Sequence, residues 1–267
     1  MLALDQWPLE DRRRITGVFT DIDDTLTTEG AITPEALQAL ADLKAAGLPV
    51  IAITGRPVGW SEPFALAWPV DAIVPENGAV ALLRSATQPG TLTKLYQQDT
   101  ATRQANFARM QQVLARLQRE VPGAMPSRDS PGRETDIAID HSEFTQLPAQ
   151  SIARVVAIMR GEGMHATVSS IHINGWYGGH DKLSGAHWIA RQLLGLNLAE
   201  HGHQWVYVGD STNDERMFAY FPNSIGVANV RRFEGQLTTK PRYITQGERG
   251  AGFAEVARAI LAAQSGA

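Results

Sequence analysis

Short apolar runs alternate with helical periodicities along the first part of the chain. The runs at 15–20, 48–54 and 71–75 are rich in β-branched residues, a composition typical of buried strands. Between the first two runs, leucines recur at helical spacing up to Gly47, and Thr33-Pro34 is typical of the start of a helix. Strands that alternate with helices predict a parallel sheet covered on both faces.

The same alternation returns towards the C-terminus. It predicts, in order, a helix at 182–194, a strand at 205–209, a helix at 213–220, strands at 224–228 and 243–245, and a helix at 252–263. These elements continue the pattern of the first part, so we expect both parts to build one sheet.

The middle of the chain has a different pattern, with antiparallel character. It predicts hairpin strands at 81–84 and 92–96, helices at 101–120 and 152–160, and alternating apolar and polar segments at 136–140 and 166–173. We therefore expect an α/β protein with a split core. The core would comprise residues 1–83 and 182–267, and residues 84–181 would form an inserted α+β domain.

Composition narrows the class of protein. The 267 residues are 43% hydrophobic and 19% charged, as in an ordinary globular protein. The net charge of -4 and the lack of a basic stripe argue against nucleic acid as a partner. The chain has no cysteine, which excludes thiol catalysis, disulfides and thiolate metal sites. No apolar stretch is long enough for a bilayer and no signal peptide is recognisable, so we expect a cytoplasmic protein without a membrane partner.

Carboxylates gather at the ends of two predicted strands. Asp21, Asp23 and Asp24 follow the first strand, and Asp210 and Asp214 follow the strand at 205–209. The carboxyl ends of parallel strands meet at one edge of a sheet, where ligands bind. Like charges this close repel one another, so we expect a hard divalent cation among them.

Four segments resemble, in their order, the motifs of the haloacid dehalogenase (HAD) superfamily of phosphohydrolases, which has a Rossmann-like core. These segments are Asp21-Ile22-Asp23-Asp24-Thr25-Leu26, Ile53-Thr54-Gly55-Arg56, Lys182, and Gly209-Asp210-Ser211-Thr212-Asn213-Asp214. The position of the insert and the sequence Pro75-Glu76-Asn77-Gly78-Ala79 look like the group with a C2B cap. That group includes phosphatases for sucrose, trehalose and mannosylglycerate phosphates, and also phosphomannomutases.

The resemblance implies roles for the first cluster. Asp21 would be the nucleophile that forms an aspartyl-phosphate, and carboxylates are known to act in this way. Asp23 would protonate the leaving group and then take a proton from the hydrolytic water. The family offers no role for Asp24, which we expect to serve a turn.

The resemblance also implies a Mg²⁺ site. Its ligands would be the side chains of Asp21 and Asp210 and the backbone carbonyl of Asp23. Asn213 and Asp214 would support the site from behind or add a contact. Oxygen ligands with retained waters suit Mg²⁺, although the sequence leaves Mn²⁺ open.

Phosphate and substrate would be held by residues of several segments. Thr54, Gly55 and Lys182 would hold the transferring phosphoryl oxygens. Candidate substrate contacts are Asn77 and Gly78 at the third strand end, with a plain Asn-Gly turn as the alternative. On the segment 170–176, alternation places His172 and Asn174 on one face together with Trp176. That face would either meet a hydroxyl-rich ligand or be solvated.

These expectations together describe a Mg²⁺-dependent phosphatase that acts on a small phosphorylated metabolite, with a sugar phosphate as the first candidate. The nearest alternative is a phosphomannomutase-like phosphotransferase of the same chemistry. A sugar-phosphate sensor without catalytic activity is an alternative from another class. A receiver-like phosphorelay domain also uses a carboxylate cluster, but it would lack the large insert and Asp23. The sequence leaves the particular sugar and the oligomeric state open.

Overall fold

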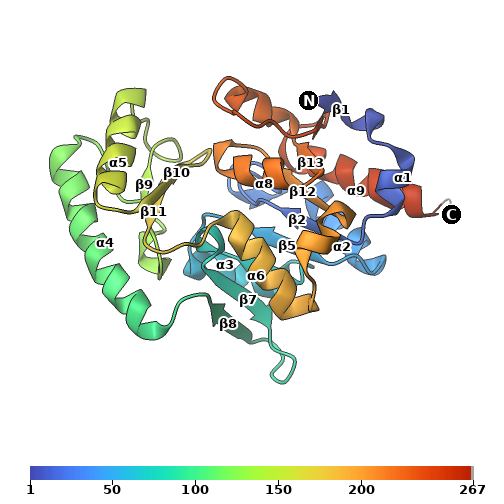
Figure 1. Cartoon of the computed structure of the whole chain (residues 1–267), viewed down its shortest axis with the longest axis horizontal. Coiled ribbons are helices and arrows are strands. Elements are labelled where there is room, and N and C mark those ends of the chain that lie inside the picture. The colour runs from blue at the N-terminus through green and yellow to red at the C-terminus, as the bar shows by residue number, and fades with distance from the viewer. Residues whose placement is uncertain (266–267) are drawn as a thin grey trace.

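A computed structural model of the protein describes residues 1–265 (Figure 1). A nine-stranded sheet forms its centre, in the order β1-β14-β13-β12-β2-β5-β6-β7-β8. The strands from β1 to β6 in this order pair in parallel, while β7 and β8 are antiparallel. Their bounds, in sheet order, are Leu2–Ala3, Tyr243–Ile244, Asn223–Gly226, Trp205–Gly209, Gly17–Thr20, Val50–Ile53, Ala72–Val74, Val80–Arg84 and Leu92–Tyr96.

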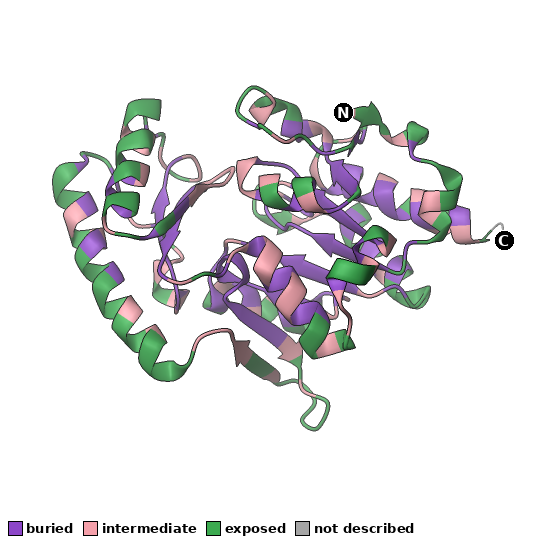
Figure 2. Ribbon diagram, viewed as in Figure 1, coloured by how far each residue is buried: buried purple, intermediate pink, exposed green. Residues whose placement is uncertain are grey.

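Two hydrophobic layers cover the two faces of this sheet. Neighbouring residues of one strand enter opposite layers, as Val18 and Phe19 of β2 do. Helices α1 (Leu9–Arg13), α2 (Pro34–Ala45), α3 (Val58–Ala67) and α9 (Arg249–Ser265) lie on the first face. Helices α6 (Lys182–Leu194), α7 (Leu198–His201) and α8 (Glu215–Tyr220) lie on the second. The inner strands of the sheet are buried, whereas the edge strands β1 and β8 are exposed or half-buried and the outer faces of the helices are largely exposed (Figure 2).

Short elements complete the core. They are the hairpin of β3 (Thr27–Thr28) and β4 (Ala31–Ile32) and the 3-10 turns η1 (Leu4–Gln6), η2 (Glu76–Gly78), η3 (Ser130–Gly132), η4 (Gly202–Gln204), η5 (Thr212–Asp214) and η6 (Ala228–Phe233), of which η3 belongs to the insert. None of the helices within residues 1–265 is long and apolar enough to cross a bilayer.

A second body, which we call the cap (residues 100–176), stands beside the core (Figure 1). It has its own antiparallel sheet in the order β10-β11-β9 and its own hydrophobic cluster, which includes Met110, Ile139 and Trp176. Its elements are α4 (Thr100–Glu120), β9 (Ile137–Asp140), α5 (Ala149–Gly161), β10 (His165–Val168) and β11 (His172–Trp176). The mixed, antiparallel character expected of the middle segment is present.

The hairpin expected at 81–84 and 92–96 is present as β7 and β8. Its expected place in the insert is wrong, because β7 pairs with β6 and the hairpin therefore extends the large sheet. The alternation at 166–173 spans two strands rather than one. Ser169 closes a tight turn between them, since its Oγ accepts the N–H groups of Ile171 and His172. The pair Ser169-Ser170 breaks the alternation of apolar and polar residues within 166–173, and the turn falls there.

The chain direction within the sheet marks a functional edge. From β2 the chain builds outward through β5 and β6, and after the cap it returns to β12 and builds the other way through β13 and β14. The order therefore reverses between β2 and β12. In open α/β sheets the ligand crevice lies at such a switch point, beyond the carboxyl ends of the strands.

Candidate active site

Asp21 and Asp210 occupy the switch point as predicted from their strand-end positions. Asp21 follows β2, and its N–H donates to the carbonyl of Val208 in β12. Both side chains are buried, at 5% and 1% exposure. Burial raises the pKa of Asp21 to about 7, against the opposing pull of Lys182. Burial also raises the pKa of Asp210, and the nearby charge of Asp21 adds to this effect. The site is therefore short of positive charge.

Lys182 supplies the nearest cation. It opens helix α6, and the Asp181 side chain caps that helix by accepting the Ser184 N–H at 2.7 Å. Its Nζ lies 2.6 Å from Asp21 Oδ1 and 2.7 Å from Asp214 Oδ1. These two carboxylates keep the buried lysine charged, and its pKa lies above the ordinary value. Lys182 thus lies against Asp21, the residue to which the resemblance gives the role of nucleophile.

Asp214 is held by its own chain. Its Oδ2 accepts the N–H groups of Asp210 and Ser211 at 2.9 and 3.2 Å, and its Oδ1 accepts the hydroxyl of Tyr207. Together with Lys182, these groups make four donors to the two oxygens of Asp214. Asp214 therefore fixes the loop after β12 and anchors Lys182. This arrangement fits the supporting position expected of it. Asn213 lines the same small cavity as Asp21 and Thr54, and its Oδ1 accepts a hydrogen bond from Ser211 Oγ at 2.9 Å.

The acidic residues fit a hard cation. Carboxylate oxygens of Asp21, Asp210 and Asp214 lie within 4.8 Å of one another. Asp210 Oδ1 is buried and has no hydrogen-bond partner within residues 1–265, a costly state for a charged oxygen. A ligand set made of oxygen atoms at a sheet edge suits Mg²⁺. Asp21 and Asp210 would hold the ion through their side chains.

Asn229 is a member of this site that the sequence reasoning missed. It lies on η6, just after β13, and its Nδ2 donates to Asp210 Oδ2 at 3.1 Å and to the carbonyl of Asp24 at 2.9 Å. Its Oδ1 accepts the N–H of Arg249 at 2.9 Å. Asn229 thereby orients Asp210. Its place after a strand next to β12 is the signal that could have revealed it.

Thr54 and Gly55 stand at the end of β5, on the other side of β2. The Thr54 hydroxyl accepts the N–H of Arg56 at 3.0 Å, and Thr54 is fully buried. The carbonyl of Gly55 accepts hydrogen bonds from the cap residues Arg133 and Asn174. A Cβ at Gly55 would lie 3.2 Å from Asn174 Oδ1, so glycine permits this close docking of the cap.

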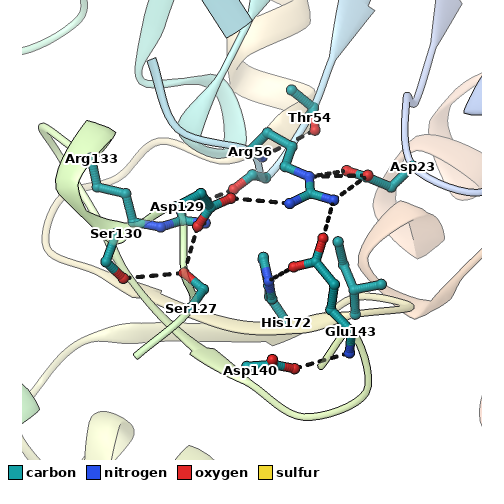
Figure 3. A network of polar contacts seen from close by, with 12 residues as sticks. Asp23, Thr54, Arg56, Ser127, Asp129, Ser130, Arg133, Asp140, Glu143 and His172 are labelled. Atoms are coloured by element: carbon teal, nitrogen blue, oxygen red, sulfur yellow. Dashed lines mark hydrogen bonds and ion pairs between the residues drawn. The ribbon is translucent and has the colours of Figure 1, made fainter. Parts of the chain in front are cut away.

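Arg56 holds Asp23, a contact that the sequence reasoning did not foresee. Its Nε lies 3.0 Å from both Asp23 oxygens, and its Nη2 lies 2.9 Å from Asp23 Oδ1. Nη2 also donates to Glu143 at 2.7 Å, and Nη1 donates to Asp129 at 3.1 Å (Figure 3). The guanidinium packs 4.9 Å from the ring centre of Trp60. All three nitrogens therefore bind carboxylates, two of which come from the cap.

The predicted substrate residues lie at the boundary between cap and core. His172 and Asn174 are buried, at 2% and 1% exposure, so the alternative of a solvated face is wrong. His172 Nε2 lies 2.8 Å from Glu143, and Asn174 Nδ2 donates to Gly55 and to Asp136. Trp176, expected on the same face, packs into the hydrophobic cluster of the cap.

Asn77 and Gly78 form part of a left-handed turn after β6. Glu76, Asn77 and Gly78 have φ values of +51°, +55° and +102°. The Asn77 side chain is buried against Gly55, and its Nδ2 has no hydrogen-bond partner within the described part of the chain. Gly78 packs instead under the first turn of α6. Asp24, expected in a turn, also has a left-handed φ of +55° and pairs with Arg249 at 2.8 Å.

Three cavities reach residues of this site, and one of them, of ≈ 380 Å³, is lined by Asn77, Lys182 and Asn213. The central one has a volume of only ≈ 10 Å³, room for about one water molecule, and it is enclosed by Asp21, Thr54 and Asn213 with Ser170 and His172 of the cap. Another cavity of ≈ 370 Å³ opens beside it on the side of Asp23 and Arg56. The cap is thus closed over the reacting groups, and space for a larger ligand lies next to Asp23.

Comparison with known proteins identifies the fold. Residues 18–125 match the family model of haloacid dehalogenase-like hydrolases. Over these residues the chain is similar to haloacid dehalogenase-like hydrolases. The resemblance inferred from the motifs is thereby confirmed, as is the α/β fold with its parallel sheet.

Several solved structures share this haloacid dehalogenase-like fold over nearly the whole chain. A Thermoplasma acidophilum protein has a TM-score of 0.68 at 15% identity, over 92% of this chain and 98% of that one. The sucrose-phosphatase of Synechocystis sp. PCC6803, solved with sucrose and phosphate, has a TM-score of 0.64 at 15% identity, over 93% and 98%. A HAD subclass IIB sugar phosphatase has a TM-score of 0.61 at 14% identity, over 94% and 99%. Identities this low show a common fold and leave the substrate open.

Proposed function

We propose that the protein is a Mg²⁺-dependent phosphatase that hydrolyses a sugar phosphate or a similar small phosphate monoester through an aspartyl-phosphate. One observation carries the proposal. Asp21 and Asp210 stand together at the switch point of the sheet, with Lys182 2.6 Å from Asp21 and the carboxylate of Asp23 beside the cavity of ≈ 370 Å³. The cap type is proposed to be C2B. The cap body is proposed to comprise residues 100–176, because β8, within the expected insert 84–181, belongs to the core sheet.

The residues divide the reaction between them. An Asp21 oxygen attacks phosphorus while the bond from phosphorus to the leaving oxygen breaks. Asp23 in its protonated form gives its proton to that oxygen, and afterwards, as the carboxylate that Arg56 holds, takes one from the water that cleaves the aspartyl-phosphate. Lys182, the Thr54 hydroxyl and the amide of Gly55 bind the phosphoryl oxygens. Mg²⁺, when bound by Asp21, the Asp23 carbonyl and Asp210, would supply positive charge between the two anions.

The cavity beside Asp23 indicates what kind of leaving group fits. Its ≈ 370 Å³ lies in the range of small-ligand sites. Four carboxylates line it and only two cations, both of which already pair with carboxylates. These residues are Asp23, Asp24, Glu29, Glu143, Arg56 and Arg249. The surplus of negative charge favours a neutral, hydroxyl-rich leaving group over an anionic one. It also disfavours a mutase, which must hold a second phosphate at this end.

The test is phosphate release by the purified protein from a panel of phosphate esters, with Mg²⁺ and with EDTA. The panel pairs neutral sugar phosphates with esters whose leaving group is anionic, such as sugar bisphosphates. We expect Mg²⁺-dependent release from neutral sugars, and a loss of at least about 10³-fold in Asp21→Asn. Full activity in Asp21→Asn, or activity unaffected by EDTA, would contradict the proposal.

A further inference from the structure

Arg56 joins the core carboxylate Asp23 to two carboxylates of the cap. Glu143 and Asp129 bind its Nη2 and Nη1, while Asp23 takes Nε and the remaining side of Nη2 (Figure 3). The planar guanidinium has fixed donor directions, so three carboxylates on its edges and Trp60 against it determine its position. The place of Asp23 is therefore set partly by the cap.

Glu143 is itself held from two sides within the cap. The carboxylate of Asp140, at the end of β9, accepts the N–H groups of Glu143 and Phe144 at 2.9 and 3.0 Å. His172, buried at the start of β11, lies 2.8 Å from Glu143 Oε2. These contacts hold the loop and the side chain of Glu143 so that its Oε1 accepts the hydrogen bond from Arg56.

The charge in this cluster is more than folding requires. Asp23, Asp129 and Glu143 share one buried guanidinium, whose side chain is 5% exposed. The neighbouring Arg133 is already committed to Asp129 and Asp136, and the other side-chain partner of Glu143 is the imidazole of His172. Buried ion pairs are weak sources of stability, and a surplus of carboxylates makes them weaker. A functional reason for bringing Glu143 to Arg56 fits this observation better than a structural one.

We propose that Glu143 is a positioning residue for the acid-base Asp23, which it reaches through Arg56 when the cap is closed. This inference rests on the proposed phosphatase function. When the cap opens, Arg56 loses both cap carboxylates and keeps Asp23 alone. When the cap closes, Glu143 and Asp129 fix the guanidinium, and Asp23 is held at the boundary between the central cavity and the one of ≈ 370 Å³. The acid-base is thus in place only over an enclosed substrate.

The reaction step concerned is the first one. As the Asp21 oxygen bonds to phosphorus, the electron pair of the breaking bond goes to the leaving oxygen, and the Asp23 proton moves to it. A leaving group whose oxygen is strongly basic depends on that proton far more than one whose oxygen is weakly basic. Loss of Glu143 should therefore penalise poor leaving groups selectively.

The experiment compares Glu143→Gln with wild type on phenyl phosphate and p-nitrophenyl phosphate, which are similar in shape and differ in the basicity of the leaving oxygen. The parameter is kcat/KM, which reports the steps up to release of the leaving group. We expect a fall of about tenfold for phenyl phosphate and of less than about twofold for p-nitrophenyl phosphate. Asp129→Asn, which removes the other cap carboxylate from Arg56, should shift the ratio in the same direction.

The matched control is Glu162→Gln. Glu162 is also a cap glutamate paired with an arginine, Arg116, but that pair lies within the cap and away from the cavity. We expect the ratio of kcat/KM on the two esters to be the same in Glu162→Gln as in wild type. Thermal unfolding of each variant checks that it is folded. Equal losses on both substrates in Glu143→Gln and Asp129→Asn, or no loss, would overturn the positioning role and leave the phosphatase intact. A wild-type protein inactive on these esters and on the sugar panel would overturn both proposals.

Discussion

Asp210 needs a neighbour to hold it, because one of its two oxygens is buried without a partner within residues 1–265. Asn229 provides the other oxygen with a hydrogen bond of 3.1 Å and is itself held by the Arg249 N–H. Partners of metal ligands fix the ligand orientation, and their removal typically weakens metal binding 10- to 100-fold. Asn229 is therefore as much a part of the proposed metal site as the carboxylates that carry the motif.

Asn229→Ala should weaken Mg²⁺ binding about tenfold or more, because Asp210 loses its orienting donor. The measurement is the Mg²⁺ concentration that gives half-maximal phosphatase activity, with direct calorimetric titration of Mg²⁺ as a second readout. At saturating Mg²⁺ the activity should largely return. Asn223→Ala, which removes a buried asparagine from the neighbouring strand β13 but not from the site, is the control. An unchanged Mg²⁺ requirement in Asn229→Ala would contradict the role.

The motif residues could be placed from sequence because each follows a strand whose apolar run is unmistakable. Asp21, Thr54 and Asp210 come together for that reason. Arg56, Glu143 and Asn229 could not be assigned in the same way. Their contacts depend on where a cap loop and a 3-10 turn dock, and the pattern of apolar and polar residues carries no information about that docking.

At the scale of elements, the turn η2 supports the start of α6. A Cβ at Gly185 would lie 2.6 Å from the Gly78 Cα, and one at Gly78 would overlap the carbonyl oxygen of Asp181. Asp181 caps α6 directly before Lys182. The close approach of the two glycines thus determines how deeply the helix start, and with it the lysine, reaches towards Asp21.

Gly78→Ala should lower the free energy of unfolding by at least about 2 kcal/mol, from left-handed strain and from the overlap together. Because the overlap falls on Asp181, activity should fall as well. Gly90→Ala is the control, since Gly90 has a similar left-handed φ of +78° but no atom within 4 Å of its Cβ position. It should show only the strain, about 1 kcal/mol, with activity retained. Equal effects in the two variants, measured by chemical denaturation, would argue against the packing role.

Element boundaries were most predictable where a helix-capping side chain marks the first turn of a helix. Thr33 accepts the Ala36 N–H at the start of α2, and α6 begins at Lys182 behind its capping aspartate, as expected. The turn between β10 and β11 escaped prediction because Ser169 closes it with its side chain and no glycine or proline marks it. The assignment of β8 failed for another reason. A hairpin looks the same in sequence whether it pairs with the core sheet or with the cap.

At the scale of the whole molecule, the cap is fastened to the core by buried charge. The Glu76 carboxylate accepts the N–H groups of Val58 in the core and of Glu134 and Thr135 in the cap. Asp129 bridges Arg56 and Arg133 across the same boundary. The closed state leaves room for about one water at the centre. A substrate must therefore enter before the cap reaches this position.

Asp129 makes this fastening dependent on pH. The charges of Arg133, His172 and Arg56, with the hydroxyl of Ser127, outweigh burial and lower the pKa of Asp129 from 3.8 to about 2. A lowered folded-state pKa contributes stability that is present above pH 3.8 and is lost as the pH falls towards 2. Asp129→Asn should therefore cost about 2 kcal/mol of unfolding free energy at pH 7. The difference from wild type should shrink below pH 4 (about the unfolded value).

Denaturation of both proteins from pH 7 down to about pH 2, which passes the unfolded value of 3.8 and reaches the folded value of about 2, measures this difference. Asp5→Asn, at an exposed position, serves as the control and should track wild type throughout. A penalty for Asp129→Asn that stays constant across the acid range would show that packing, rather than charge, fastens the loop.

The adjacency of β2 and β12 has a consequence for biosynthesis. A chain leaving the ribosome presents β2, β5, β6 and the entire cap before β12 exists. Until then one edge of β2, with Val18 and Phe19, lacks its permanent neighbour, and unpaired apolar edges invite wrong pairing. About four fifths of the 267 residues must be translated before Asp210 can join Asp21. Until β12 is translated, the chain therefore lacks the assembled site and keeps an unpaired apolar strand edge.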